Sequence, residues 1–493
     1  MDEPRHEVLW FGEAPTAQAV REFANRRLTI ASIGDNAPLP PLPGVAGAIF
    51  AFPKRDREGL FAAAAAHART FVDYGARVEL IAPDDATTGR VQARLGAALA
   101  LPNVSVRTSP RGFEIAEAAA RHDAGYKPRT DLEIVVAGNR EPIRKVDEPL
   151  FQRAFQHCRR IALVELTGGR SDARVFAVHM TVDRSDAGVW PQPAFAKLDR
   201  NDKIAREFQN YRDFADKFIP FGLRPNVQDV VVGGERSLLV GNFVDRSESL
   251  WDLARRKLAA TAVTALIDET LGGWRDQAYA SDPAHGSVAR AMIGAGLSKP
   301  NLIRPRYAEV ARDQGVTITP DALWDKLLGL QQRYRVAPVH GDLHGENVRV
   351  RNGQAILIDL ASVARGPLTA DLAALETWLA FELPPERPED QYEDCAWREE
   401  IRRLYAPAAF QHPPGPCDPT SNLGWMSTVV RQIRHMGIAA QSCPTEYQTA
   451  VAVQLLRRCQ WDDGPPADRY RRGVGYVVAA ALTEDAQHRS PSI

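Results

Sequence analysis

The sequence predicts an α/β domain with a parallel sheet, followed by a larger α+β region whose strands precede its helices. Residues 6–124 alternate short apolar runs with helical patterns, and residues 160–246 are rich in strand patterns. From about residue 249 the pattern is helical, except over 337–365. Strands that alternate with helices favour βαβ units and a parallel sheet, whereas strands followed by helices favour an α+β arrangement.

These patterns divide the chain into an α/β domain, a connector, a strand-rich part and a helical part. The expected boundaries are, in that order, 1–126, 127–159, 160–246 and 247–493. The connector contains the apolar run LEIVVAG, which could supply one strand to the next domain. The chain has 493 residues, which is enough for two or three domains.

The composition is that of an ordinary globular protein, with 44% hydrophobic and 25% charged residues. A formal net charge of -1 gives no general reason to expect nucleic acid or an anionic membrane as a partner. The five cysteines show no CxxC spacing, which argues against a disulfide framework or a zinc site. No signal peptide and no long apolar window are evident, so we expect a cytoplasmic protein.

The first domain has strand candidates that are short and apolar and end near Gly, Pro or Asp. They read HEVLWFG, LTIAS, AGAIFAF, ARVELIA and VSVRT. Helical patterns such as 57–74 and 88–100 lie between them. This succession predicts a three-layer domain of flavodoxin-like or receiver-like type.

The segment HGDLHGEN, residues 340–347, carries the clearest chemical pattern. An Asn352-Gly353 pair follows it and predicts a tight hairpin, after which the chain reads Ile358-Asp359. Phosphoryl transfer needs a carboxylate to orient an acceptor hydroxyl and take its proton, and Asp342 is the candidate. It also needs Mg²⁺, which prefers oxygen ligands, and Asn347 and Asp359 can offer them once the hairpin brings them together.

HGDLHGEN followed by ILIDLASVARGPLTADLA resembles the aminoglycoside phosphotransferase branch of the protein-kinase-like superfamily. The resemblance implies a two-lobed fold that uses ATP and Mg²⁺. It implies that Asp342 is the catalytic base, that Asn347 and Asp359 are metal ligands, and that Asp371 braces the catalytic loop. His340 is expected to have a scaffold role, while His344 is left open between a structural role and a contact with the acceptor.

If the resemblance holds, nucleotide-binding residues must precede this loop. Lys197 ends a strand pattern and Glu207 lies ten residues on in a helical pattern, so they are the expected ion pair that positions the phosphates. A phosphate loop is expected between the first two strands, where Gly168 and Gly169 let backbone amides approach and Ser171 adds a hydroxyl.

Segment 240–244 reads as the strand whose backbone would meet adenine. The run TGGRSDARVF, joined to the catalytic loop, also resembles the kinase-like domains of the ternary-complex-associated type, found in bacterial conflict and signalling systems. This likeness spans roughly 160–480 and favours a regulatory protein over a plain resistance enzyme.

The first domain lacks most of the groups that a phosphorylated receiver needs. Its first strand ends at a single acid, Glu13, and the third ends at Lys54 with Asp56 coming too late. After the fifth strand, Ser109-Pro110 keeps the proline without a lysine. We therefore expect a pseudo-receiver that binds a protein partner or self-associates.

Two alternatives stay open. A small-molecule kinase acting on an antibiotic or metabolite would favour an acidic acceptor pocket, for which Glu376, Glu382 and 386–394 are candidates, although such residues are more often a solvated face. A pseudokinase scaffold would act through protein interaction alone. The acceptor itself is unidentified, and the helical segment at about 250–335 is where its specificity is expected to lie.

Overall fold

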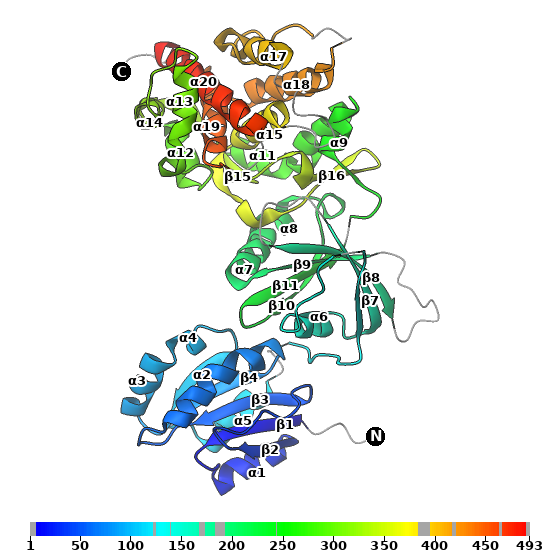
Figure 1. The fold of residues 1–493 in the computed structure, drawn as a ribbon, viewed down its shortest axis with the longest axis vertical. Coiled ribbons are helices and arrows are strands. Elements are labelled where there is room, and N and C mark those ends of the chain that lie inside the picture. The colour runs from blue at the N-terminus through cyan, green and yellow to red at the C-terminus, as the bar shows by residue number, and fades with distance from the viewer. Residues whose placement is uncertain are drawn as a thin grey trace. The chain divides into compact units, whose positions relative to one another are not determined.

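The computed structural model describes 6–121, 125–138, 140–166, 173–182, 193–242, 244–382, 395–416, 421–462 and 466–489. The chain forms two compact units (Figure 1). Unit 1 comprises 1–208 and 226–245, and unit 2 comprises 209–225 and 246–493. Across the described ranges, no helix combines the length and the apolar character that a membrane span needs.

The first domain of unit 1 contains a parallel sheet, as predicted. Its strands are β1 (His6–Gly12), β2 (Leu28–Ile33), β3 (Val45–Ala51), β4 (Arg77–Ala82) and β5 (Val104–Thr108). The helices are α1 (Ala17–Asn25), α2 (Glu58–Asp73), α3 (Asp85–Arg94), α4 (Gly96–Leu99) and α5 (Gly112–Ala120). The strand order β2-β1-β3-β4-β5 is one of the common doubly wound orders, so the α/β assignment is confirmed. The receiver-like identity stays a prediction.

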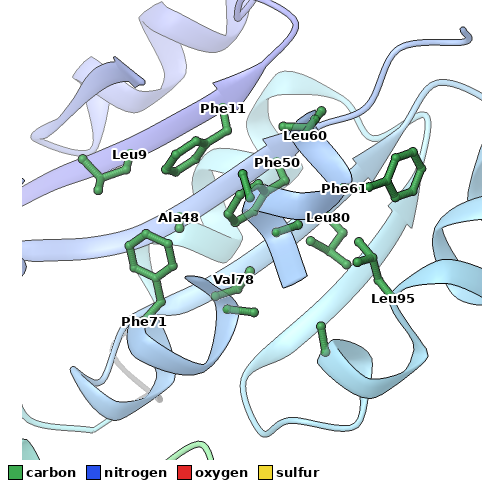
Figure 2. Close-up of a cluster of buried hydrophobic side chains, with 14 of the residues drawn as sticks. Leu9, Phe11, Ala48, Phe50, Leu60, Phe61, Phe71, Val78, Leu80 and Leu95 are labelled. Carbon is green, nitrogen blue, oxygen red and sulfur yellow. The ribbon is translucent and has the colours of Figure 1, made fainter. Parts of the chain in front are cut away.

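Both faces of this sheet are buried. Successive side chains of a strand point to opposite faces, so a strand such as β1 contributes to two core clusters. Leu9 and Phe11 belong to the core cluster that includes residues of α2 and α3, and Phe11 stacks on Phe50 with ring centroids 4.5 Å apart (Figure 2). Val8 and Trp10 belong to the second cluster, with residues of α1 and α5. Each fully buried large apolar side chain stabilises the domain by about 1.5–3 kcal/mol.

The second sheet of unit 1 has the order β10-β11-β9-β8-β7-β6. Its strands are β6 (Glu133–Val136), β7 (Cys158–Glu165), β8 (Arg174–Val182), β9 (Ala194–Arg200), β10 (Val227–Val232) and β11 (Arg236–Asn242). Neighbours pair antiparallel except β6 and β7, which are parallel. Strand β6 comes from the predicted connector, which therefore does supply one strand. The helices here are α6 (Glu148–Ala154) and α7 (Asn201–Asn210).

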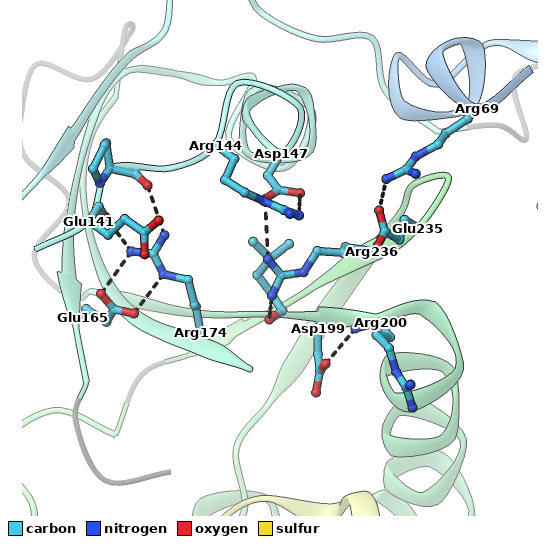
Figure 3. A network of polar contacts seen from close by, with 12 residues as sticks. Arg69, Glu141, Arg144, Asp147, Glu165, Arg174, Asp199, Arg200, Glu235 and Arg236 are labelled. Carbon is cyan, nitrogen blue, oxygen red and sulfur yellow. Dashed lines mark hydrogen bonds and ion pairs between the residues drawn. The ribbon is translucent and has the colours of Figure 1, made fainter. Parts of the chain in front are cut away.

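Within unit 1, Arg153 of α6 links the domain that contains the first sheet to the domain that contains the second sheet. Its buried guanidinium donates hydrogen bonds to the carbonyls of Val72, Tyr126 and Val232, at 3.2, 2.9 and 2.9 Å. Burial lowers the pKa of Arg153 to about 10. Arg69 of α2 also pairs with Glu235 in the β10–β11 turn (Figure 3).

Unit 2 is mainly helical, as the sequence predicts. Its helices are α8 (Asp216–Phe218), α9 (Leu250–Arg255), α10 (Ala260–Ala265), α11 (Gly272–Tyr279), α12 (Val288–Gly294), α13 (Pro305–Arg312), α14 (Pro320–Gly329), α15 (Ala370–Phe381), α17 (Cys395–Tyr405), α18 (Gly424–Ala440), α19 (Glu446–Arg458) and α20 (Pro466–Arg489). Its strands form small sheets: β12 (Glu248–Ser249), β13 (Ala284–Gly286), β14 (Gln332–Tyr334), β15 (Val336–Val339), β16 (Val348–Arg351), β17 (Gln354–Leu357) and β18 (Ala364–Pro367).

The predicted hairpin is confirmed by the pairing of β16 with β17. Asn352 and Gly353 both have positive φ, 53° and 79°, as a type I′ turn requires. Val348 pairs with Leu357 at the open end of the hairpin. The hairpin therefore places the residues just before β16 beside those just after β17.

Candidate active site

The loop 340–347 lies between β15 and β16, so strands fix both of its ends. Strand β15 pairs antiparallel with β18, which comes after Asp359 in the chain. Gly341 has φ 79°, and a Cβ there would lie 2.3 Å from the carbonyl oxygen of Ser362. A side chain at position 341 would therefore disturb the loop's packing against the segment that follows Asp359.

Asp371, in the first turn of α15, holds the backbone of the loop in place. Its carboxylate accepts hydrogen bonds from the amides of His340 and Gly341, at 2.6 and 3.1 Å. Burial raises the pKa of Asp371, because the charged form loses its contact with water. These contacts agree with the structural role that the resemblance implies.

His340 is fully buried and ties the loop to the strand end before Asp359. The Asp342 amide donates to Nδ1 of His340 at 3.3 Å, so Nδ1 is the acceptor nitrogen. The other ring nitrogen, Nε2, lies 2.9 Å from the carbonyl oxygen of Ile358 and must carry the proton in that bond. Both partners belong to the backbone, and this matches the expected scaffold role.

The structure brings the two expected metal ligands to the open end of the hairpin. The Ile358 amide donates to the carbonyl of Asn347 at 3.0 Å, and Asp359 is the next residue. The side-chain Nδ2 of Asn347 donates to the carbonyl of Asp342 at 2.9 Å. Because the loop uses the nitrogen end of that amide, the oxygen end is the one that can bind a metal.

Asp359 has the left-handed backbone conformation, with φ 59° and ψ 71°. A non-glycine residue is held in that region only where its surroundings fix it, and such residues are enriched at functional sites. Among the residues that the structure describes, no three His, Cys, Asp or Glu side chains gather as a metal site. Asn347 and Asp359 still fit Mg²⁺, since that ion is usually held by one or two side chains together with phosphates and water.

Asp342 is half exposed, and Arg457 of α19 pairs with it. The Nη2 atom of Arg457 lies 2.9 Å from Oδ1 of Asp342, and Nη1 donates to the carbonyl of Gly341 at 2.7 Å. Arg457 was not among the residues predicted from the sequence. No motif marks this residue, and the contact joins positions 115 residues apart.

His344 stacks on Trp378, with ring centroids 5.3 Å apart. Its Nε2 lies 4.0 Å from Oδ2 of Asp342. Burial lowers the pKa of His344, although the charge of Asp342 opposes this shift. The imidazole is therefore held neutral in neutral solution, beside the oxygen of Asp342 that Arg457 does not contact.

In unit 1, the structure brings Lys197 and Glu207 together. Lys197 Nζ on β9 lies 2.8 Å from Oε2 of Glu207 on α7, and both side chains are largely buried. A buried pair of this kind is costly to break, because the remaining charge has no compensation. The expected phosphate-loop residues Gly168, Gly169 and Ser171 lie outside the described residues.

The structure places Glu376 neither in the acidic acceptor pocket that a small-molecule kinase would favour nor on a solvated face. Glu376 is fully buried, where its carboxylate accepts hydrogen bonds from Arg434 at 3.0 and 3.1 Å and from the Tyr447 hydroxyl at 2.7 Å. Glu382 pairs with Arg458 at 2.7 Å. Of the third candidate, segment 386–394, nothing lies within the described residues.

Residues 281–409 match a family model described as "Phosphotransferase enzyme family". The catalytic loop lies inside the matched segment. So do Asn347, Asp359 and Asp371, and the match supports a phosphotransferase domain here. No curated protein matches the chain.

Solved structures are also similar to the chain. A thermostable mutant of aminoglycoside phosphotransferase APH(4)-Ia, in a ternary complex with ADP and hygromycin B, is 13% identical, with 66% of this chain and 93% of that chain covered and a TM-score of 0.37. Amicoumacin kinase hAmiN, in complex with AMP-PNP, Ca²⁺ and Ami, is 12% identical, with coverages of 66% and 89% and a TM-score of 0.34. A glucosamine kinase in complex with glucosamine, ADP and inorganic phosphate is 13% identical, with coverages of 66% and 93% and a TM-score of 0.33.

Proposed function

We propose that the chain is an ATP- and Mg²⁺-dependent phosphotransferase that transfers the γ-phosphate to a hydroxyl of an acceptor. One observation carries this proposal. The loop that bears Asp342 is fixed through its backbone by Asp371 and His340, while the hairpin sets Asn347 beside the residue before Asp359. The match of residues 281–409 to a phosphotransferase family supports the same reaction class.

Each side chain has a proposed task. Asp342 orients the acceptor hydroxyl and takes its proton as the bond to phosphorus forms. Asn347 and Asp359 hold Mg²⁺, which when bound neutralises charge on the phosphate oxygens. Lys197, kept in place by Glu207, binds phosphate oxygens of the nucleotide.

The first domain is proposed to be a pseudo-receiver that serves a protein partner or self-association. Its acids near the sheet's strand ends are used in surface ion pairs: Asp56 with Arg90 at 3.0 Å, and Asp84 with Lys54 at 3.9 Å. Such pairs leave little of the acidic cluster that receiver chemistry needs. A cytoplasmic signalling or conflict role in a bacterium is proposed for the whole chain, from the resemblance of residues 160–480 to ternary-complex-associated kinase-like domains.

The test is Mg²⁺-dependent ATP binding, measured by calorimetry with and without the metal. The wild type is expected to bind ATP only with Mg²⁺, and Asp359→Ala to lose at least about tenfold in affinity, since one metal ligand is gone. Asp325→Ala, an exposed acid on α14, is the matched control and should bind like the wild type. If the wild type binds no ATP, the chain is a scaffold without catalysis and the proposal fails.

A further inference from the structure

Among the described residues, two carboxylates near the catalytic loop are each paired with an arginine. Arg457 neutralises Asp342, and Arg458 neutralises Glu382. A polycation needs several uncompensated carboxylates to bind, and these described residues do not supply them.

An exposed indole lies near Arg457, the arginine that pairs with Asp342. Trp461 is 39% exposed, although it is one of the largest apolar side chains. The guanidinium of Arg457 lies 5.7 Å from the centre of its ring, and the same guanidinium contacts Asp342. Arg457 therefore connects the exposed indole to the proposed catalytic carboxylate.

The backbone of Trp461 is fixed by two side chains. The Tyr307 hydroxyl donates to the Trp461 carbonyl at 2.8 Å, and Nη1 of Arg472 donates to the same oxygen at 3.0 Å. Tyr307 and Arg472 are themselves buried. On the preceding residue, Gln460 Nε2 donates to the Ser298 hydroxyl at 2.9 Å. An exposed aromatic ring on a backbone held this way is prepared for a ligand, because little ordering remains to be done on binding.

We propose that Arg457 and Trp461 form an acceptor subsite beside Asp342, and that this subsite takes an uncharged, hydroxyl-bearing ring rather than a polycation. The apolar face of such a ring packs on the indole, as amphipathic ligands do on tryptophan. The guanidinium keeps Oδ1 of Asp342 occupied, so Oδ2 is the oxygen that receives the acceptor hydroxyl. This inference rests on the proposed phosphotransferase activity.

The acceptor class is tested by ADP release from the full chain with ATP and Mg²⁺. D-glucose and myo-inositol are the neutral probes, and hygromycin B and kanamycin are the cationic ones, each at about 10 mM, above the usual range of KM. A neutral ring is expected to raise ADP release at least about tenfold over the basal rate, with little effect of the cations. Greater stimulation by a cationic probe, or by a serine-containing peptide, overturns the inference, and so does stimulation by no neutral probe.

Variants test whether Trp461 and Arg457 form the subsite. Trp461→Ala is expected to raise the KM for the neutral acceptor about tenfold and to leave the KM for ATP within about twofold. Trp461→Phe, which keeps a ring, should recover most of this loss. Tyr279→Ala is the matched control, because an arginine also lies over that exposed ring, at 4.9 Å. Equal effects of Trp461→Ala on both KM values would show a structural role and overturn the assignment.

Arg457→Lys and Arg457→Gln separate positioning from folding. Lysine keeps the charge without the two-pronged contact, so kcat should fall for Arg457→Gln and recover in part for Arg457→Lys or on addition of guanidinium. No rescue by either route would overturn the positioning role. If Mg²⁺-ATP binding is intact while every acceptor test fails, only the subsite is wrong; if ATP binding is also absent, the proposed function itself fails.

Discussion

The catalytic-loop region and the first domain use their acidic residues in opposite ways. In the region 340–371, Asp371 is buried and its carboxylate is bonded to two backbone amides, so it fixes the position of another acid. In the first domain, Asp56 is exposed and pairs with Arg90 across the surface. In this chain, the acid that is held by buried contacts lies beside the candidate catalytic residue, whereas the exposed acid is used in a surface ion pair.

The largest effect is expected when the charge of Asp342 is removed. Asp342→Asn should lower kcat by about 10²–10⁴, because an amide cannot take the acceptor proton. The free energy of unfolding should change little, since the side chain is half exposed. Steady-state kinetics together with urea unfolding measures both, and undiminished turnover would remove Asp342 from the role of base.

The next largest effect is expected at Asp371, on the free energy of unfolding. Asp371→Ala leaves the amides of His340 and Gly341 buried without their acceptor. The free energy of unfolding should therefore fall by about 2–4 kcal/mol. Urea denaturation followed by circular dichroism gives the value. A change below about 0.5 kcal/mol, which is usual for surface positions, would show that Asp371 is not a brace.

A third prediction concerns pH and another buried acid, Glu446 of α19. Burial raises its pKa to about 7, although the Thr369 hydroxyl donates to its carboxylate at 3.0 Å. The folded protein therefore keeps this proton up to about pH 7, while the unfolded chain loses it near the ordinary value of 4.5.

Because the unfolded state releases the proton first, the free energy of unfolding should fall as pH rises from about 4.5 to about 7 and then level off. The fall should be up to about 3 kcal/mol, and Glu446→Gln should remove it. Urea unfolding at pH 5, 6 and 8 measures the slope. An identical slope in Glu446→Gln would assign the pH dependence to other groups.

The smallest effect is expected in the first domain. Asp56→Ala breaks an ion pair whose side chains are 57% and 35% exposed, so it should cost less than about 1 kcal/mol. Thermal unfolding of this variant should nearly match the wild type, and ATP binding should be unchanged. A loss as large as that expected for Asp371→Ala would show that Asp56, too, holds the structure in place.

The sequence predicted features that local chemistry determines. The Asn352-Gly353 turn follows from the positive φ that both residues tolerate, and the hairpin then sets Asn347 beside Ile358. The Lys197–Glu207 contact followed from a strand and a helix in succession. Their roles in nucleotide and metal binding stay predictions.

What the sequence could not predict depends on partners distant along the chain. Arg457 reaches Asp342 across 115 residues, and no spacing rule relates them. Glu376 was misassigned because its partner Arg434 lies 58 residues further on, and only the packing of α15 against α18 brings them together. A lone glutamate in a helical pattern does not show whether its side chain will be buried against an arginine or exposed to solvent.

Arg153 has a consequence for how the chain folds as it is synthesised. Its acceptors at Val72 and Tyr126 precede it in the chain, but the carbonyl of Val232 follows 79 residues later. On the ribosome, which adds about 5–20 residues per second, this cation waits several seconds for its last acceptor. Until β10 emerges, Arg153 lacks the acceptor on the second sheet, so this link between the two domains of unit 1 forms late in synthesis.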